Sequence, residues 1–254
     1  MSREANLERA SELLCRAEHA VALTGAGIST ASGVPDFRTP GEGLWEKADP
    51  MEVASIHTLR RTPDVFYRWV RPIIAAMASA QPNSAHQALA DLEAIGQLKA
   101  VITQNIDGLH QMAGSRRVLE LHGHVRTATC LQCFRKWPAE QVLEPIRRND
   151  VPRCAVCAGV LKPDAILFGE QLPADVFGMA MEHIHQADLI LVIGSSLMVM
   201  PAAKLPALVH ANGGQVLVFN RQPTYADAFA AATFRGDAAD ILAELAQACA
   251  AVRR

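Results

Sequence analysis

Short apolar runs alternate along the chain with longer stretches in which apolar residues recur every three or four positions. The runs are of strand length and occupy residues 20–23, 100–103, 189–193 and 216–219. The periodic stretches predict amphipathic helices at residues 6–18, 83–92, 176–184 and 241–249. Buried strands that alternate with helices are typical of a parallel sheet covered on both faces. We therefore predict an α/β fold with a Rossmann-like parallel sheet.

Each predicted strand ends in small or polar residues. The first runs into Gly25-Ala26-Gly27 and the second into Gln104-Asn105, whereas the last two end at Gly194-Ser195-Ser196 and at Asn220. In open parallel sheets the ligand binds beyond the carboxyl ends of the strands. Four polar strand ends therefore predict one binding crevice at that edge of the sheet.

Two segments interrupt the alternation. Residues 38–82 hold several prolines, so we expect this segment to be irregular and broken into short pieces. Residues 126–164 contain four cysteines and no long periodic pattern, and a strand-like run at 166–168 follows them. The cysteine segment is predicted to be an insertion that forms a small second domain.

The composition narrows the class of protein. Half of the residues are hydrophobic, and 24 basic against 26 acidic residues leave a formal net charge of −2, which argues against a chain built to wrap nucleic acid. No apolar stretch approaches the roughly 18 residues that a membrane span requires. The first residues are polar and lack the apolar core of a signal peptide. We expect a soluble, cytoplasmic protein that binds neither membranes nor nucleic acid directly.

Four of the six cysteines form two Cys-x-x-Cys pairs, at the spacing of a structural zinc site. Four thiolates fill the zinc tetrahedron and leave no position for water or substrate. A disulfide framework is the competing interpretation, but nothing else indicates an oxidising compartment. The other two cysteines, Cys15 and Cys249, lie in helical patterns and are predicted to pack as small hydrophobic residues. The predicted zinc ligands are Cys130, Cys133, Cys154 and Cys157.

The glycine turn after the first strand begins a dinucleotide-binding fingerprint, in which bare backbone lets a pyrophosphate approach N–H groups. The fingerprint is incomplete, because Thr30 stands at the third glycine position and no acidic residue ends a second strand about twenty residues on. A tight turn without a ligand explains the glycines nearly as well. The polar loop that follows favours a ligand, since it carries Ser29, Ser32, Asp36 and Arg38, and Arg38 can pair with a phosphate.

Several segments, in order along nearly the whole chain, resemble the motifs of the sirtuins, the NAD-dependent protein-lysine deacylases, in their bacterial and archaeal form. The cysteine pairs fall where that family carries its zinc. The matching segments are Gly25-Ala26-Gly27-Ile28-Ser29, Gly33-Val34-Pro35-Asp36-Phe37-Arg38, Thr103-Gln104-Asn105-Ile106-Asp107-Gly108-Leu109-His110, Glu120-Leu121-His122-Gly123, Phe168-Gly169-Glu170, Gly194-Ser195-Ser196-Leu197 and Asn220.

This resemblance implies NAD-dependent removal of acetyl groups from protein lysines, giving nicotinamide, O-acetyl-ADP-ribose and free lysine, and it also allows other short acyl groups. The partners would be acyl-lysine proteins or peptides, and we expect a monomer with one structural zinc. The implied NAD-binding domain comprises residues 1–38, 83–125 and 165–254. A helical module (39–82) and a zinc-binding module (126–164) would form the small domain.

His122 is implied to be the catalytic base that deprotonates a ribose hydroxyl of NAD, because imidazole accepts a proton near neutral pH. Asn105 would order the reacting ribose. Structural readings compete with these roles: a lone histidine beside glycine is more often structural, Asn105 and Asp107 sit where short polar side chains cap turns, and Asp237 can simply cap a helix. The implied NAD-binding residues are Gly25, Ala26, Gly27, Ile28, Thr30, Phe37, Arg38, Gln104, Asn105, Ile106, Asp107, Ser195, Ser196, Asn220 and Asp237.

The substrate peptide is implied to add as an extended strand between residues 166–169 and 197–200, with its acyl-lysine in an apolar tunnel. The implied substrate-binding residues are Ile166, Phe168, Gly169 and Val199. Phe37 would shield the reactive sugar carbon from water, although ordinary core packing explains this residue as well.

Three alternatives stay open. Desuccinylases or demalonylases of the family carry a Tyr and an Arg three residues apart; here Tyr67 is followed by Val70, with Arg71 one step beyond, so we expect an acetyl preference. The same NAD pocket would also serve an ADP-ribosyltransferase. A zinc-ribbon nucleic-acid module or an NAD sensor without turnover is the third reading, although a solvated basic face explains the nearby arginines equally well.

Overall fold

A six-stranded parallel sheet forms the centre of the large body in the computed structural model, which describes residues 3–39, 41, 43–46 and 48–252. The strand order is β3-β2-β1-β7-β8-β9, and every pair is parallel. The predicted Rossmann-like α/β fold is confirmed, with two short edge strands that the sequence pattern did not reveal. The strands are β1 (Ala20–Thr24), β2 (Leu98–Thr103), β3 (Val118–Glu120), β7 (Leu189–Ile193), β8 (Gln215–Phe219) and β9 (Ala232–Phe234).

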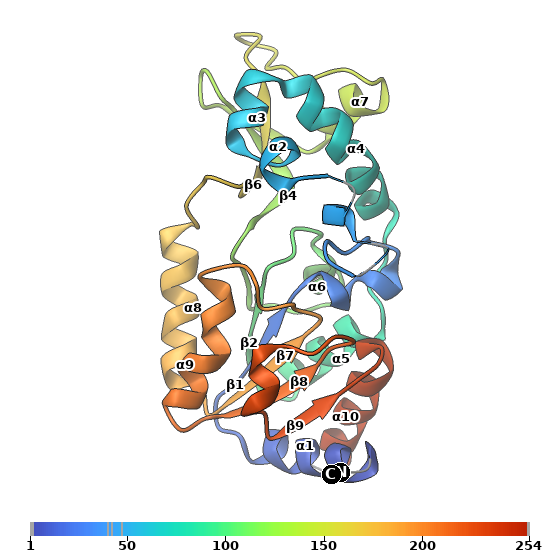
Figure 1. Ribbon diagram of the computed structural model, residues 1–254, viewed down its shortest axis with the longest axis vertical. Helices are drawn as coiled ribbons and strands as arrows, with labels where there is room; N and C mark the ends of the chain where they lie inside the picture. The colour runs from blue at the N-terminus through green and yellow to red at the C-terminus, as the bar shows by residue number, and fades with distance from the viewer. Residues whose placement is uncertain (1–2, 40, 42, 47, 253–254) are drawn as a thin grey trace.

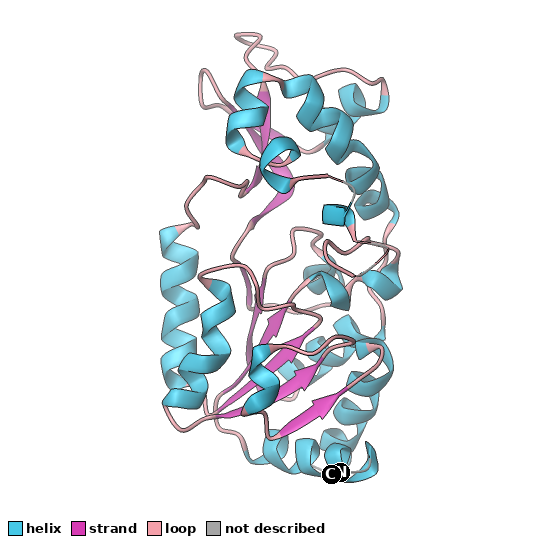
Figure 2. Ribbon diagram, viewed as in Figure 1, coloured by secondary structure: helices cyan, strands magenta, loops and turns pink. Residues whose placement is uncertain are grey.

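Helices cover both faces of this sheet (Figures 1 and 2). Alternate residues of a strand point to opposite faces, so Ala22 and Leu191 pack under α1 (Arg3–Arg16), α5 (Ser84–Ala94) and α10 (Ala238–Val252). Leu23 and Val192 pack on the other face, under α8 (Ala174–Gln186) and α9 (Leu205–Ala211). This double cover explains why the central strands contain no polar face.

The two interrupting segments pack together at the opposite end of the molecule (Figure 1). An antiparallel sheet of order β5-β4-β6 shares a core with the helices of residues 50–79, in which Leu59, Phe66 and Tyr67 meet Cys130 and Leu161. The elements are α2 (Pro50–Val53), α3 (Ile56–Arg61), α4 (Pro63–Ser79), β4 (Gly123–Cys130), β5 (Lys136–Pro138), α7 (Glu140–Arg147) and β6 (Leu161–Ala165).

A few residues of both predicted domains are not described, and the described residues include several short helices. Residues 40, 42 and 47 of the predicted helical module, and residues 1–2 and 253–254 of the predicted NAD-binding domain, lie outside the described residues. No helix among the described residues is long and apolar enough to cross a membrane. The remaining short helices are η1 (Ala26–Ile28), η2 (Thr30–Ser32), η3 (Leu44–Glu46), α6 (Leu109–Met112), η4 (Ala202–Lys204) and η5 (Tyr225–Ala228).

Two expectations about local structure were wrong. The 38–82 segment is not broken throughout, because α4 runs for 17 residues and continues through Pro72. Its buried stripe, which includes Phe66 and Ile74, compensates for the hydrogen bond that a proline removes. Residues 166–168 are not a strand: β6 ends at Ala165, and Phe168 makes only an isolated bridge to Ser55.

Candidate active site at the strand ends

The polar residues after β1, β2, β7 and β8 bond to one another across the carboxyl edge of the large sheet. The Gln104 side chain donates to Ser195 Oγ at 2.8 Å, and the Ser195 backbone N–H donates to Asn220 Oδ1 at 2.9 Å. The Asn220 amide donates back to the Ser195 carbonyl at 2.5 Å. The Gln104 backbone N–H also donates to the Thr24 carbonyl of β1 at 2.9 Å, so four strand ends meet in one place. Asn220, implied to bind a ribose, uses its amide to fix Ser195.

Glycines let the turns after β1 and β7 pack backbone against backbone. A Cβ at Gly25 would lie 2.7 Å from the Gly194 carbonyl oxygen, and one at Gly27 would lie 2.8 Å from Gly194 Cα. Gly194 itself has φ +59°, a conformation that disfavours side chains. Thr30, at the position where the fingerprint has its third glycine, donates its hydroxyl to the Gly27 carbonyl at 3.1 Å. The glycine turn is thus required by this close approach as well as by any ligand.

His122 has a fixed tautomer. Its Nδ1 lies 2.9 Å from the backbone carbonyl oxygen of Gln104, and a carbonyl only accepts, so Nδ1 carries the hydrogen and Nε2 carries the lone pair. Burial lowers the pKa of His122; the Gln104 hydrogen bond opposes this shift and the nearby positive charge of Arg38 adds to it. The ring is therefore neutral at neutral pH and able to accept a proton.

Asn105 and Asp107 belong to one buried network built on Ser29. Asn105 Nδ2 donates to the Gly25 carbonyl at 3.1 Å and to Ser29 Oγ at 3.2 Å. Ser29 Oγ donates to Asp107 Oδ2 at 2.8 Å, and the other Asp107 oxygen accepts from the Leu109 N–H at 3.0 Å. Burial raises the pKa of Asp107, and these hydrogen bonds oppose that shift. The Asn105 amide hydrogens are committed, which leaves its Oδ1 as the atom that can accept from a ligand.

Two buried histidines, His86 and His110, pack behind this network and bond to it. His86 Nε2 lies 3.4 Å from Ser29 Oγ, and its Nδ1 accepts from the Asn83 N–H at 3.3 Å. His110 Nε2 lies 2.9 Å from the hydroxyl of Thr24. Burial lowers the pKa of His86 to about 4 and that of His110 to about 3, so both are neutral. The sequence signal for His86 was its place three residues after the helix cap Asn83.

The loop after η2 carries an aromatic cluster that joins the two bodies of the protein. Phe37 stacks on Trp45 at 5.0 Å between ring centroids, and Trp45 stacks on Trp69 of α4 at 5.3 Å. The edge of Phe168 meets Trp45 at 5.8 Å. Asp36 accepts from the backbone N–H groups of residues 38 and 39 and so fixes the turn that holds Arg38. The family resemblance implied roles for Phe37 and Arg38, whereas nothing in the sequence pattern indicated Trp45.

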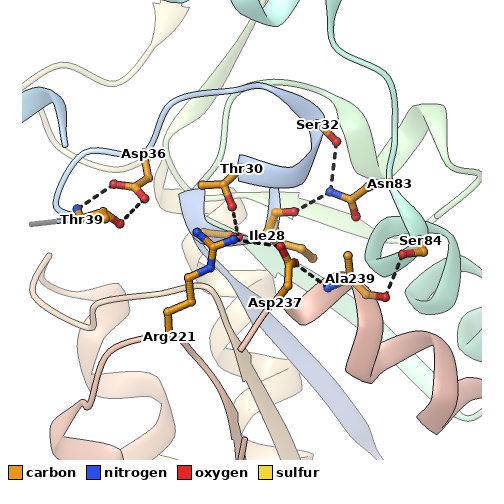
Figure 3. A network of polar contacts seen from close by, with 11 residues as sticks. Ile28, Thr30, Ser32, Asp36, Thr39, Asn83, Ser84, Arg221, Asp237 and Ala239 are labelled. Atoms are coloured by element: carbon orange, nitrogen blue, oxygen red, sulfur yellow. Dashed lines mark hydrogen bonds and ion pairs between the residues drawn. The ribbon is translucent and has the colours of Figure 1, made fainter. Parts of the chain in front are cut away.

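The other residues that are implied to contact NAD differ in their exposure and in their bonding partners. The Ile28 side chain is buried in the core, and its carbonyl accepts from Asn83 at 2.8 Å, whereas Ser196 is exposed. Asp237 caps α10 through the Ala239 N–H at 3.0 Å and also pairs with Arg221 at 2.9 Å. Figure 3 shows Arg221 extending toward Asp237 and the turn that carries Thr30. Arg221, which follows Asn220 directly, was not identified from the sequence.

The loop of residues 166–170, which includes the implied substrate segment 166–169, is bonded directly to the backbone of His122. The Ile166 N–H donates to the His122 carbonyl at 2.8 Å, and the Phe168 N–H donates to the Ala54 carbonyl at 3.1 Å. Buried Lys162 pairs with Glu170 at 3.1 Å, and Glu170 also accepts from the Leu167 N–H at 2.8 Å. The ion pair of Lys162 and Glu170 therefore stabilises the conformation of this loop. Residues 197–200, which carry Val199, form no strand in the structure either.

Gly123 allows the chain to turn immediately after His122. Its φ is +68°, and a Cβ there would lie 2.1 Å from the carbonyl oxygen of Asp164. The turn brings β4 alongside β6, where Gly123 pairs with Ala165. The His122-Gly123 pair thus connects the site in the large sheet to the small sheet.

The four paired cysteines converge at the far end of the small sheet, where their sulfur atoms all lie within 4.8 Å of one another. Cys130 Sγ is 3.4 Å from Cys157 Sγ, and Cys133 Sγ is 3.7 Å from Cys154 Sγ. Zinc–sulfur bonds of about 2.3 Å in a tetrahedron require sulfur separations of about 3.8 Å. Backbone N–H groups also point at Cys130 Sγ, as expected around a thiolate. The donor set and its geometry fit one structural zinc ion.

Comparisons with known proteins agree with this geometry. A family model described as the Sir2 family matches residues 25–201. A protein from Sulfolobus acidocaldarius named an NAD-dependent protein deacetylase is 46% identical over 224 residues, 88% of this chain and 87% of that protein. An NAD-dependent protein deacylase 2 from Archaeoglobus fulgidus is 42% identical over 96% of both chains.

Solved structures match along almost the full length. A Sir2 structure with a p53 peptide and NAD+ has a TM-score of 0.87 and 39% identity, and covers 97% of this chain and 98% of that chain. A Sir2 variant with a deacetylated p53 peptide and 3′-O-acetyl ADP ribose has a TM-score of 0.90 and 39% identity over the same shares.

Proposed function

This chain belongs to the Sir2 family, and on that premise we propose how its own residues remove acetyl groups from protein lysine side chains. The chain is an NAD-dependent protein-lysine deacetylase, and the products are nicotinamide, O-acetyl-ADP-ribose and free lysine. Acyl-lysine peptides are its partners. The observation that carries the residue assignment is the hydrogen bond from His122 Nδ1 to the Gln104 carbonyl, which leaves a buried neutral base at the strand ends.

The donor set at the strand ends fits NAD. The half-buried guanidinium of Arg38 suits a phosphate, Gln104 and the exposed hydroxyl of Ser196 suit hydroxyl or phosphate oxygens, and Asp107 with the Ile106 backbone suits a carboxamide. Asn105 Oδ1 accepts from a ribose hydroxyl. Asn220 acts by orienting Ser195, and Asp237 acts through the start of α10 and its pair with Arg221.

NAD supplies the ribose carbon that releases nicotinamide and receives the acyl oxygen of the modified lysine. His122 Nε2 takes the proton of a ribose hydroxyl, because its Nδ1 is already protonated and held by Gln104. Asn105 orients that ribose, since its amide is held by Gly25 and Ser29. Phe37, stacked on Trp45, keeps water away from the reacting carbon. The zinc cluster takes no part in these steps, because four thiolates leave no open position.

We propose that the substrate lies against residues 166–169 and Val199, with its backbone paired to the loop that Ile166 ties to His122. We also propose that the chain is divided into two domains. The proposed NAD-binding domain comprises residues 1–38, 83–125 and 165–254. The proposed smaller domain comprises residues 39–82 and 126–164 and contacts the substrate loop.

Acetyl is the proposed acyl group. Tyr67, which marks acid-preferring relatives when an arginine follows three residues later, donates its hydroxyl to the Leu161 carbonyl, and Val70 is buried. Tyr67, Arg68, Arg71 and Asp150 line one cavity of about 150 Å³, and none of its lining residues belongs to the strand-end network. Because this cavity lies apart from the strand-end network, we infer that the arginines of α4 do not pair with the acyl group.

The test incubates the protein with NAD and an acetyl-lysine peptide and measures the release of nicotinamide by mass spectrometry. Wild-type protein releases nicotinamide and forms O-acetyl-ADP-ribose, whereas His122→Ala forms neither; His124→Ala, two residues away, is the matched control and keeps activity. Faster removal of succinyl than of acetyl would overturn the acyl assignment. ADP-ribose attached to the peptide would favour the transferase alternative. We further propose that the enzyme is a cytoplasmic monomer, for which elution at the monomer mass in gel filtration is the first check.

A further inference from the structure

Two cysteines that play no part in zinc binding touch each other between the first and last helices. Cys15 lies in the last turns of α1, Cys249 lies in α10, and their sulfur atoms are 3.0 Å apart. The residues are separated by 234 positions in the sequence. Nothing in the catalytic network described above uses either sulfur atom.

The surroundings of this cysteine pair are apolar and tightly packed. Cys249 is 1% exposed and belongs to the core cluster under α1, α5 and α10, while Cys15 is half-buried and packs against that cluster. The pair is therefore held in place from both helices, and Cys15 is the member that solutes reach. A disulfide requires sulfur atoms about 2.05 Å apart, so bond formation needs a movement of only about 1 Å.

We propose that Cys15 and Cys249 form an oxidation site at which a hydroperoxide closes a reversible disulfide between α1 and α10. The Cys15 sulfur attacks a peroxide oxygen, which gives a sulfenic acid and one molecule of water. The Cys249 sulfur then attacks the Cys15 sulfur and displaces hydroxide, which takes the Cys249 proton and leaves as a second water. Two thiols and one hydrogen peroxide thus give one disulfide and two waters.

The disulfide closes a loop that includes almost the whole chain. Cross-links that close long loops restrict the unfolded state most strongly in the chain-entropy description, so oxidation raises the thermal unfolding temperature. α10 begins at the Asp237 cap, packs against η1 in the turn after β1, and lies beside α1. The disulfide therefore secures the far end of the helix whose first turn borders the NAD crevice, without touching the catalytic residues.

The experiment treats zinc-loaded protein with hydrogen peroxide and digests it with trypsin without reduction. The expected product is a linked pair of peptides, residues 10–16 and 236–253, with a mass about 2 Da below the sum of the two, because two hydrogen atoms are lost. The unfolding temperature, followed by circular dichroism, should rise by several degrees and return to its starting value after dithiothreitol.

Cys15→Ser and Cys249→Ser are the controls, and neither should show linkage or a rise in unfolding temperature. Zinc content is measured before and after treatment to check that the four-cysteine zinc cluster is intact during the comparison. The wild-type peptide map does not depend on either variant folding well. Peptides that stay unlinked after peroxide treatment, or a linked protein whose unfolding temperature does not rise, overturn the proposal.

Discussion

The Nδ1 atom of His122 lies 2.9 Å from the backbone carbonyl oxygen of Gln104. This contact joins the turn before β4 to the end of β2 and decides which ring nitrogen can act as a base. Because Gln104 also donates its side chain to Ser195, one residue positions both the base and the turn after β7.

The acidic limb of the kcat/KM profile, which reports the free enzyme, should lie below pH 6.5. Burial and the charge of Arg38 lower the pKa of His122, and the unprotonated ring is the active form, so activity persists to lower pH than an ordinary histidine allows. Arg38→Met removes a positive charge and should move the limb to higher pH. Profiles of kcat/KM, measured at subsaturating NAD and peptide, test this, with exposed Arg68→Met as the control; an unmoved limb in Arg38→Met would contradict the assigned interaction.

Gly194→Ala should lower stability by about 1–3 kcal/mol and weaken NAD binding. The added methyl group would lie 2.3 Å from the Ile28 backbone nitrogen, at a positive φ. Gly178→Ala is the matched control, because α8 leaves open space around it and alanine favours helices by up to about 1 kcal/mol. Urea unfolding and NAD titration measure both effects. Equal stabilities of the two variants would show that the turn-to-turn contact is dispensable.

Lys162→Met should raise the KM for the acetyl-lysine peptide by roughly tenfold, which corresponds to about 1.4 kcal/mol, while the KM for NAD changes little. The substitution leaves Glu170 without its partner and loosens the loop of residues 166–170. Lys162→Arg keeps the charge and should restore most of the peptide affinity. A purely structural role would instead lower kcat and affect both KM values together.

Loss of zinc should abolish peptide turnover through unfolding of the small sheet. Cys130 and Cys154 share a core with Phe66 and Tyr67 of α4, so removing the metal loosens the helices that hold Phe168 through Ala54 and Ile56. A strong chelator or Cys154→Ser should lose both metal and activity. Metal analysis should find one zinc per chain in the wild type and in Cys15→Ser. Full activity of metal-free protein would show that the cluster is not needed for the fold of this region.

Acid should destabilise the protein through His86 and His110. Their pKa values, lowered by burial to about 4 and about 3, lie below the value of about 6.5 in the unfolded chain. The unfolded state therefore binds more protons between pH 6.5 and about 3, and stability falls as pH falls through that range. His110→Gln should flatten this dependence, as measured by urea midpoints at pH 7 and pH 5, whereas exposed His185→Gln should leave it unchanged.

Much of the site was predictable, because its residues either directly follow predicted strands or belong to closely spaced cysteine pairs. The apolar runs located β1, β7 and β8 closely, and parallel strands bring their carboxyl ends together, so Gln104, Ser195 and Asn220 could be expected to meet. The cysteine spacing alone indicated the metal cluster, since a tight turn presents both thiolates of a pair.

The unpredicted parts depend on contacts between distant segments. Ser29 and His86 act together only because α5 packs beside the turn after β1, and nothing in either local sequence indicates this pairing. Residues 166–168 read as a strand from their apolar pattern, but Phe168 pairs with Ser55 and packs on Trp45, so tertiary contacts replace a sheet ladder. The helix through Pro72 forms because its buried face outweighs one lost hydrogen bond.

The stacking of Phe37, Trp45, Trp69 and Phe168 has a spectroscopic consequence. Two of the three tryptophans of the chain sit in this cluster, at the junction between the loop of the large sheet and α4. Their ultraviolet emission therefore responds to the distance between these two parts. The third tryptophan, Trp137 of β5, packs with Trp69 against the core of the small sheet. The enzyme therefore carries intrinsic fluorophores that report changes at this junction, without any attached dye.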